Sequence, residues 1–300
     1  MNVVVVGAGA IGMLVASFIA ESSYKVTLIS KREEQVHLLK KNGIVRENLN
    51  QTVQTNEVEV MTDLSDISKD SVLIVAVKYA QLKDLYSSIS SLSEEVPVLF
   101  IQNGLAHYEE ALTLPQKTIF FGSCQFGAQK LNDYTVAHRG DGSMKLAFER
   151  GNHQAFAFLQ QLQMKLLPIQ IEENAEYMLF RKALLNCFIN PLTAILKMKN
   201  GQILESSHTL NIVESMYNEL MLAFPEVKGN LLLEDVLDLC RKTSTNTSSM
   251  LTDFLQHRPT EIDTIVGAVI ERASRRGSNL PTLSTLYHLL KVLEKSGEKM

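Results

Sequence analysis

The hydrophobic and polar positions of this chain change character near residue 170. Before that point, continuous apolar runs at 3–6, 72–77 and 98–101 alternate with helical periods at 13–20 and 79–92. Such runs are typical of strands buried on both faces of a parallel sheet, and their alternation with helices is the βαβ pattern. We therefore predict an α/β sheet domain in the first half.

Other short strands are expected in the same half. Residues 43–61 alternate polar and apolar positions, as a hairpin with one solvated face does. Residues 118–122, 134–138 and 144–148 are also predicted to be strands, and they could extend the sheet as a meander around a turn at 140–142. A helix at 153–167 and a strand at 168–171 complete this half.

Helical periods run from residue 175 to the end, with loops at 225–230 and 243–249. The pattern predicts an α/β Rossmann-type domain over 1–170 and an all-helical domain over 171–300. No Gly/Ser/Pro-rich linker marks the change, so we expect closely packed domains with a site in the cleft between them.

A glycine fingerprint, G-x-G-x-x-G, follows the first apolar run directly. Its cofactor-binding candidates are Gly7, Ala8, Gly9, Ala10, Ile11 and Gly12. Between a strand and a helix, this spacing permits a tight turn, lets a pyrophosphate approach the backbone, and places the phosphates at the helix N-terminus. We predict a dinucleotide site, against the alternative of an ordinary glycine turn.

The end of the second strand, at 25–29, indicates which dinucleotide. An acid there would accept the ribose 2′-hydroxyl of NAD, but this chain has Lys31 and Arg32, which suit the 2′-phosphate of NADP(H). The alternative is that both are solvated charges opening a surface helix at Glu33, Glu34 and Gln35.

Polar residues also follow the next two predicted strands. Lys78 and Gln81 come after one of them, and Asn103 with Gly104 comes after the other. Carboxyl ends of parallel strands line the ligand crevice of an open sheet, so we expect these side chains at the cofactor site. Taken singly, Lys78 is more typical of an ordinary loop cation and Asn103 of an ordinary turn asparagine, and their shared location is what indicates a site.

One stripe of a predicted helix carries an ammonium group and two amides. Lys182, Asn186 and Asn190 are spaced i, i+4, i+8 among apolar neighbours, which places them on one face. Pro191 removes a backbone donor and favours a kink. A solvated stripe on an amphipathic helix is the plainer interpretation.

Composition narrows the function classes. A net charge of −4 argues against nucleic-acid binding, and no stretch reads as a targeting segment or a membrane span. The three cysteines form no C-x-x-C motif, which favours free thiols in the cytoplasm. No His, Cys or acid spacing predicts a metal site.

Three later segments carry a family resemblance. They are RKALLNCFINPLTA at 181–194, SSMLTD at 248–253 and RPTEID at 258–263. With the glycine fingerprint, Lys78, Gln81 and the QNG at 102–104, they resemble the ketopantoate reductase (2-dehydropantoate 2-reductase) family over nearly the whole chain. The resemblance implies NADPH-dependent reduction of ketopantoate to (R)-pantoate in pantothenate and coenzyme A biosynthesis, with the site between a Rossmann domain and a helical domain.

The resemblance also implies residue roles. Lys182 would be the general acid that protonates the C2 oxygen, and partial desolvation would lower its pKa toward neutrality. Glu261 would be the second catalytic residue and bind the substrate hydroxyl, although an acid in a first helical turn fits the sequence as well. The substrate contacts would be Asn103, Lys182, Asn186, Asn190, Ser249 and Glu261. Ser249 could instead cap a helix over 250–257.

Two departures from the family leave alternatives open. Residues 122–128, GSCQFGA, lack the threonines and histidine common there, and Lys31–Arg32 stands where one arginine is usual. The substrate could therefore be another branched 2-oxo acid, and a protein that senses NADPH without turnover is a third hypothesis. The sequence does not fix the oligomeric state, for which a homodimer is one expectation.

Overall fold

The computed structural model describes residues 1–22, 24–162 and 167–297 and shows two compact units. The first comprises Met1–Gln102 and Tyr108–Met178, and the second comprises Asn103–His107 and Leu179–Met300. An α/β unit is thus followed by a helical one, which confirms the predicted fold class.

The units divide inside helix α6 (Ala175–Leu196), whereas the limit expected near residue 170 falls in strand β12 (Ile169–Glu172). The second unit also takes in Asn103–His107 from the first half of the chain. A change of periodicity marks where helices begin, and it cannot reveal that one helix serves both units.

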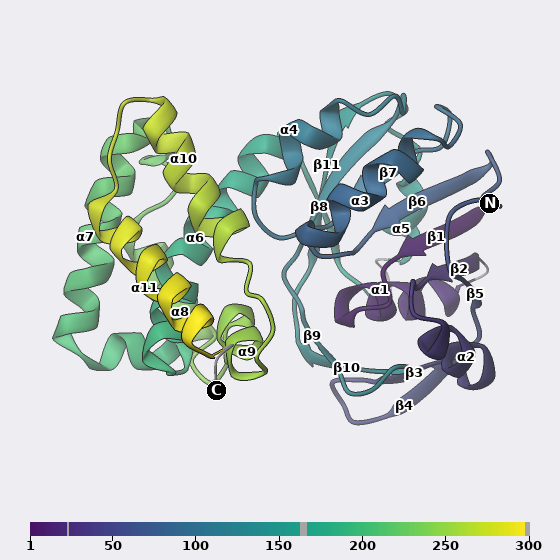
Figure 1. Ribbon diagram of the computed structural model, residues 1–300, viewed down its shortest axis with the longest axis horizontal. Helices are drawn as coiled ribbons and strands as arrows, with labels where there is room; N and C mark the ends of the chain where they lie inside the picture. Colours follow the sequence, from purple (N-terminus) through teal and green to yellow (C-terminus); the bar gives the residue numbers. More distant parts are fainter. Residues whose placement is uncertain (23, 163–166, 298–300) are drawn as a thin grey trace. The chain divides into compact units, whose positions relative to one another are not determined.

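The first unit contains an eight-stranded sheet in the order β12-β11-β8-β7-β6-β1-β2-β5 (Figure 1). Neighbours from β8 to β5 are parallel, and β11 runs antiparallel to β8. The strands besides β12 are β1 (Asn2–Val6), β2 (Lys25–Ile29), β5 (Glu59–Met61), β6 (Ser71–Val75), β7 (Val98–Phe100), β8 (Ile119–Cys124) and β11 (Met144–Arg150).

The order of the strands reverses at β1. Val6, the last residue of β1, is in register with Ile29 of β2 on one side and Val75 of β6 on the other. The chain reaches β2 first and returns past β1 to β6, so the two crossovers diverge at this point. Such a switch point opens a crevice at the carboxyl ends of the strands, where open α/β sheets bind ligands.

A second sheet of four strands has the order β4-β3-β10-β9. Its strands are β3 (Ile44–Glu47), β4 (Val53–Asn56), β9 (Gly127–Lys130) and β10 (Thr135–Gly140). The expected hairpin is present as β3 and β4, but the last part of its predicted range joins the main sheet as β5. The meander was wrong for β10, which pairs with β9 and β3.

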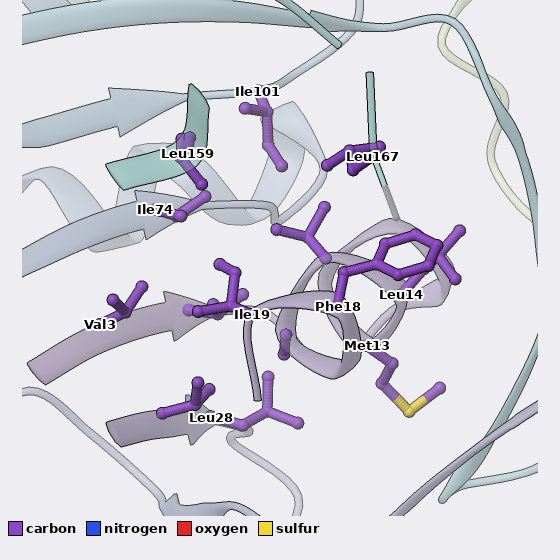
Figure 2. Packing of buried hydrophobic residues seen from close by; sticks show 14 of the residues in the cluster. Val3, Met13, Leu14, Phe18, Ile19, Leu28, Ile74, Ile101, Leu159 and Leu167 are labelled. Atoms are coloured by element: carbon purple, nitrogen blue, oxygen red, sulfur yellow. The ribbon is translucent and has the colours of Figure 1, made fainter. Parts of the chain in front are cut away.

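Helix α1 (Ala10–Ala20) lies between the two sheets. It contacts β1 and β2 of the main sheet and β3, β9 and β10 of the second (Figure 1). Every residue from Gly12 to Ile19 is buried because the helix is covered on both sides, and Ser17 is the one polar residue among them. Ile19 of α1 shares a buried cluster with Val3 and Ile74 of the main sheet (Figure 2).

A buried arginine ties the second sheet to α1. Arg46 of β3 has a side chain only 1% exposed, and its guanidinium carbon lies 4.3 Å from the centre of the Phe18 ring. It donates to the Glu21 carboxylate at 2.8 Å and to the Ser17 hydroxyl at 3.2 Å. A buried charge persists only when it is paired and hydrogen-bonded, as this one is.

The other helices of the first unit are short. They are α2 (Glu33–Asn42), α3 (Tyr79–Ser90), α4 (His107–Leu112) and α5 (Ala157–Leu162). Helix α5 covers part of the predicted helix at 153–167, of which residues 163–166 lie outside the described residues.

Among its described residues, the second unit contains helices joined by loops and no strand. After α6 come η1 (Asn200–Glu205), α7 (Ser207–Ala223), η2 (Pro225–Val227), α8 (Leu233–Lys242), α9 (Ser249–Leu255), the π-helical turn η3 (Asp263–Gly267), α10 (Ala268–Arg275) and α11 (Pro281–Gly297). Helix α6 continues through Pro191 as a single element. Among the described helices, it alone is long and apolar enough to cross a membrane, but 67% of its apolar window is buried, as in the core helix of a globular protein.

The glycine loop supplies a stability prediction. A Cβ atom at Gly12 would lie 1.8 Å from the backbone oxygen of Gly7, whereas one at Gly9 would meet nothing within 4 Å. We expect Gly12→Ala to lower the free energy of unfolding by at least about 2 kcal/mol, because backbone must move. Gly9→Ala should stay within about 1 kcal/mol of the wild type. Urea denaturation of both variants tests this, and equal losses would contradict it.

Candidate functional site

The glycine loop leads into the N-terminal end of helix α1. Gly7 has a φ of +110°, a conformation that favours glycine, and its Cβ would meet Val77 at 2.9 Å. Gly9 precedes the helix without a side-chain cap and is exposed. The first N–H groups of α1 are thus open to an anion, and the open space at Gly9 lets a phosphate approach. The loop fits a dinucleotide.

Lys31 and Arg32 lie at the end of β2, where α2 begins. Both are exposed, and Arg32 occupies the N-cap position ahead of Glu33 and Glu34 in the first turn. The backbone here therefore matches the alternative in which these charges precede a surface helix. Arg32 also forms an ion pair with Asp133 of the β9–β10 turn, so its side chain is directed to a particular partner.

The two candidates after β6 occupy the start of α3. Lys78 is the N-cap residue of that helix, and Gln81 lies in its first turn; both are exposed. The neighbouring Gln102 is buried and donates its side-chain amide to the carbonyls of Val75, at 2.9 Å, and Val77, at 3.1 Å. That amide ties the ends of β6 and β7 together.

Three predicted residues are joined in series within the second unit. The Lys182 ammonium of α6 donates to the side-chain oxygen of Asn103 at 2.9 Å. The amide nitrogen of Asn103 donates to the Glu261 carboxylate at 3.0 Å. All three side chains are partly buried. Glu261 precedes the helical turn, and its backbone carbonyl accepts from the Thr264 hydroxyl in that turn at 3.1 Å. A cation, an amide and a carboxylate therefore converge from three separate segments of the sequence.

A close backbone contact holds the Asn103 segment in place. Gly104 has a φ of +83°, and a Cβ there would lie 2.3 Å from the backbone oxygen of Thr264. The next residue, Leu105, donates its backbone N–H to the same oxygen at 3.2 Å. Only a glycine permits this approach, which brings Asn103 within reach of Glu261.

Glu261 is held by the π-helical turn η3 that follows it. Asp263 in that turn accepts from the Tyr287 hydroxyl at 2.7 Å and from the Lys291 ammonium at 2.9 Å. These hydrogen bonds hold the pKa of Asp263 below its usual value even though burial opposes them. Upstream, Thr260 donates its backbone N–H to Glu294 at 2.9 Å. Helix α11 thus fixes the backbone on both sides of Glu261, and π turns are frequent at functional sites.

His107 was not singled out by the sequence. It is fully buried at the end of the Asn103 segment, and burial, followed by the positive charge of Lys182, lowers the pKa of its imidazole to about 3. His107 is therefore neutral at physiological pH and adds no second cation beside Lys182. Its only sequence signal is a position four residues after Asn103.

The remaining candidates lie on α6 and α9. Asn186 is half-buried and Asn190 is only 5% exposed, so the stripe begun by Lys182 is not a solvated face. Ser249 is exposed at the first position of α9, and the capping oxygen belongs to Ser248, which accepts from the Leu251 N–H at 3.1 Å. The capping alternative therefore applies to the preceding serine. Substrate contacts for these residues stay predictions.

Metal ligands were not expected, and the part of the chain that the structure describes contains no group of three or more His, Cys, Asp or Glu side chains that could hold an ion.

The low pKa of His107 predicts acid-sensitive stability. Unfolded histidine takes up a proton near pH 6.5, whereas His107 in the fold does so only near pH 3. The unfolded state therefore binds more protons between these values, and stability is lost as the pH falls through that window. Between pH 6.5 and 4.5, the free energy of unfolding of His107→Asn should therefore fall less than that of the wild type. The difference should be up to about 1.4 kcal/mol per pH unit.

The exposed His208 supplies the control, because His208→Asn makes the same substitution at a surface position. Urea denaturation at several pH values measures both variants. Parallel curves for the wild type and His107→Asn would contradict the prediction.

The combined features define a class. A glycine loop at the switch point of a parallel sheet, followed by a helical unit with a lysine, an amide and a carboxylate in series, is the organisation of a dinucleotide-dependent oxidoreductase. The chain belongs to the ketopantoate reductase family: the model of Ketopantoate reductase PanE/ApbA matches residues 3–150, and that of its C-terminal part matches 174–294.

Relatives support the family over the whole length. A 2-dehydropantoate 2-reductase of Listeria monocytogenes is 36% identical over 98% of this chain and 97% of its own. One of Bacillus subtilis is 30% identical over the full length of both chains. Among solved structures, a ternary complex of D-mandelate dehydrogenase with NADH and anilino(oxo)acetate is 25% identical, with a TM-score of 0.87 over 99% of each chain.

Proposed function

We propose that this protein reduces ketopantoate to (R)-pantoate with NADPH, as a step of pantothenate biosynthesis, and the name 2-dehydropantoate 2-reductase of its relatives supports this proposal. The observation that carries the proposal is the series from Lys182 through Asn103 to Glu261. Reduction of a 2-oxo acid to a 2-hydroxy acid needs a hydride at C2 and a proton at the C2 oxygen. The series contains a proton donor and a hydrogen-bond acceptor suited to the second requirement.

The first unit would hold the cofactor. The residues assigned to the cofactor are, in the first unit, Gly7, Ala8, Gly9, Ala10, Ile11, Gly12, Lys31, Arg32, Lys78 and Gln81, and, in the second unit, Asn103. The open helix end at Gly9 suits the pyrophosphate, and the cations after β2 suit a 2′-phosphate. When bound, the cofactor supplies the hydride to C2.

Lys182 would hold the proton that the C2 oxygen takes up. Its ammonium is partly buried, and a charged donor in such a place stabilises a developing alkoxide more than it would in water. Asn103 keeps the ammonium directed by accepting one of its hydrogens. Glu261 would accept a hydrogen bond from the substrate hydroxyl, and Asn186, Asn190 and Ser249 would contact the rest of the substrate.

A second candidate is reduction of another branched 2-oxo acid. A relative in the same structural class is a D-mandelate dehydrogenase solved with NADH, so both substrate and cofactor vary among proteins of this fold. The unusual segment at 122–128 contains Ser123 and Phe126, which are both buried in the first unit. A protein that senses NADPH without turnover would have no use for a lysine directed by an amide.

The decisive assay follows the absorbance of NADPH with ketopantoate, with NADH as the alternative cofactor and a panel of other 2-oxo acids as alternative substrates. Rapid oxidation of NADPH with ketopantoate, and slow oxidation with NADH, is expected. Faster turnover of another 2-oxo acid would favour the second candidate. Tight NADPH binding without turnover of any substrate would favour the sensor.

Substitutions of Lys182 and Asn103 should have non-additive effects on kcat. We expect Lys182→Ala to lower kcat about 10²-fold to 10⁴-fold, the usual contribution of a general acid. Asn103→Ala should lower kcat less, because the ammonium remains but loses its direction. In the double variant the losses should not add, since both act through one proton. Steady-state kinetics test this.

Lys242→Ala, an exposed lysine of α8 in the same unit, is the control and should keep wild-type kcat. Near-normal turnover by Lys182→Ala with an unchanged pH dependence would show that the general acid is another group.

Assembly and location complete the proposal. We propose a homodimer, which light scattering would show as twice the 33.5 kDa of the chain.

We also propose a cytoplasmic location. All three cysteines are free thiols, which agrees with a reducing compartment.

A further inference from the structure

Two cations meet one acid beside the glycine loop. Asp133, in the turn between β9 and β10, forms an ion pair with Arg32 and a second with Lys130, whose ammonium lies 2.8 Å from the same carboxylate oxygen. The Asp133 side chain is 22% exposed and that of Lys130 is 29% exposed. One carboxylate oxygen thus lies where two cations from separate segments converge.

The buried amide of Gln35 places this cluster at the nucleotide loop. Gln35 is 3% exposed, and its amide nitrogen donates to the backbone oxygens of Ala8 and Asp133, each at 2.9 Å. Its amide oxygen accepts from the Ser30 hydroxyl at 3.0 Å and from the Arg32 guanidinium at 3.2 Å. One side chain therefore joins the glycine loop, the end of β2 and the turn that carries Asp133.

The turn itself is rigidly built. The side-chain oxygen of Asn132 accepts the backbone N–H groups of Tyr134, at 3.0 Å, and Thr135, at 2.7 Å. Leu131 donates its N–H to the Thr135 carbonyl at 2.9 Å. Asp133 is consequently presented by a fixed backbone rather than by a loose loop.

Asp133 carries a charge at neutral pH. Its hydrogen bond to Lys130, more than that to Arg32, keeps the pKa of the carboxyl below its usual value. A carboxylate held by an arginine and a lysine has the chemistry of a phosphate held by the same groups, but a phosphate monoester has close to two negative charges instead of one.

We infer that Arg32 and Lys130 together form the 2′-phosphate site of the cofactor, and that Asp133 is an internal anion which the 2′-phosphate must displace. This inference rests on the proposed use of NADPH. It adds Lys130, which no sequence motif indicated, and it selects Arg32 from the pair Lys31–Arg32. It also makes Asp133 a specificity-determining residue that weakens binding of a 2′-phosphate and leaves binding of a 2′-hydroxyl largely unaffected.

Isothermal titration with 2′,5′-ADP and 5′-AMP tests the inference, because the two nucleotides differ only at the 2′ position and need no turnover. Removing the charge with Asp133→Asn should tighten 2′,5′-ADP about threefold to tenfold, since a nearby like charge is lost in a partly exposed site. Lys130→Met should weaken 2′,5′-ADP about tenfold. Binding of 5′-AMP should change less than twofold in both variants, and the gain in Asp133→Asn should shrink in 0.5 M salt.

A matched ion pair at the opposite end of β2 provides the controls. Lys25 and Glu59 lie 2.8 Å apart on the surface, so Lys25→Met and Glu59→Gln change charge in the same unit. Neither should alter the ratio of the two affinities. Circular dichroism and the melting temperature of each variant show that the fold is retained, and Asn at 133 keeps the backbone oxygen that Gln35 binds.

Three results are decisive. A wild type that prefers 2′,5′-ADP, with the opposite effects of Asp133→Asn and Lys130→Met described above, supports the inference. The inference is overturned if the wild type shows the same preference but Asp133→Asn binds 2′,5′-ADP as the wild type does or more weakly. It is also overturned if the substitutions affect both nucleotides equally. Either result leaves the proposed function standing. A wild type without preference contradicts the use of NADPH itself, and the inference with it.

Discussion

The side-chain amide of Asn103 is bonded in both directions, and the arrangement of the candidate active site depends on it. Its oxygen accepts from Lys182 and its nitrogen donates to Glu261. An ionised aspartate could not donate to the glutamate, and an apolar residue would leave both partly buried charges without this bridge. The amide in turn depends on Gly104, whose missing side chain allows the backbone to approach Thr264. Local backbone geometry therefore decides where Lys182 and Glu261 are held relative to one another.

The first unit applies a similar constraint to the nucleotide loop. Helix α1 is enclosed by two sheets, so it cannot shift to accommodate an added atom, and the contact between Gly12 and the Gly7 backbone fixes its first turn against β1. Gln35, which follows β2, then ties the glycine loop to Asp133 by donating to the backbone oxygens of Ala8 and Asp133. A tightly packed core thus sets the relative positions of the glycine loop and the neighbouring cations.

Much of the fold could be predicted because its signals are local. Continuous apolar runs identified β1, β6 and β7, and the glycine spacing identified the start of α1. Partners distant in the chain could not be predicted, because strand pairing and side-chain contacts are not encoded in a short window. Such contacts place β10 in the second sheet and group Asn103 with the helical unit. They also determine the surroundings of His107 and Asp133. The family motifs pointed to Lys182, Asn103 and Glu261, and the structure adds the hydrogen bonds that connect them.

The central claim is that this chain transfers hydride to C2 of ketopantoate and supplies the proton from Lys182. The most direct measurement uses NADPH with deuterium at the transferable C4 position, ketopantoate, and the wild-type protein, with the product analysed by mass spectrometry and proton NMR. The account predicts pantoate with one deuterium at C2, formed far more slowly by Lys182→Ala. Pantoate without deuterium at C2, or no pantoate from a folded protein that binds NADPH, would contradict it.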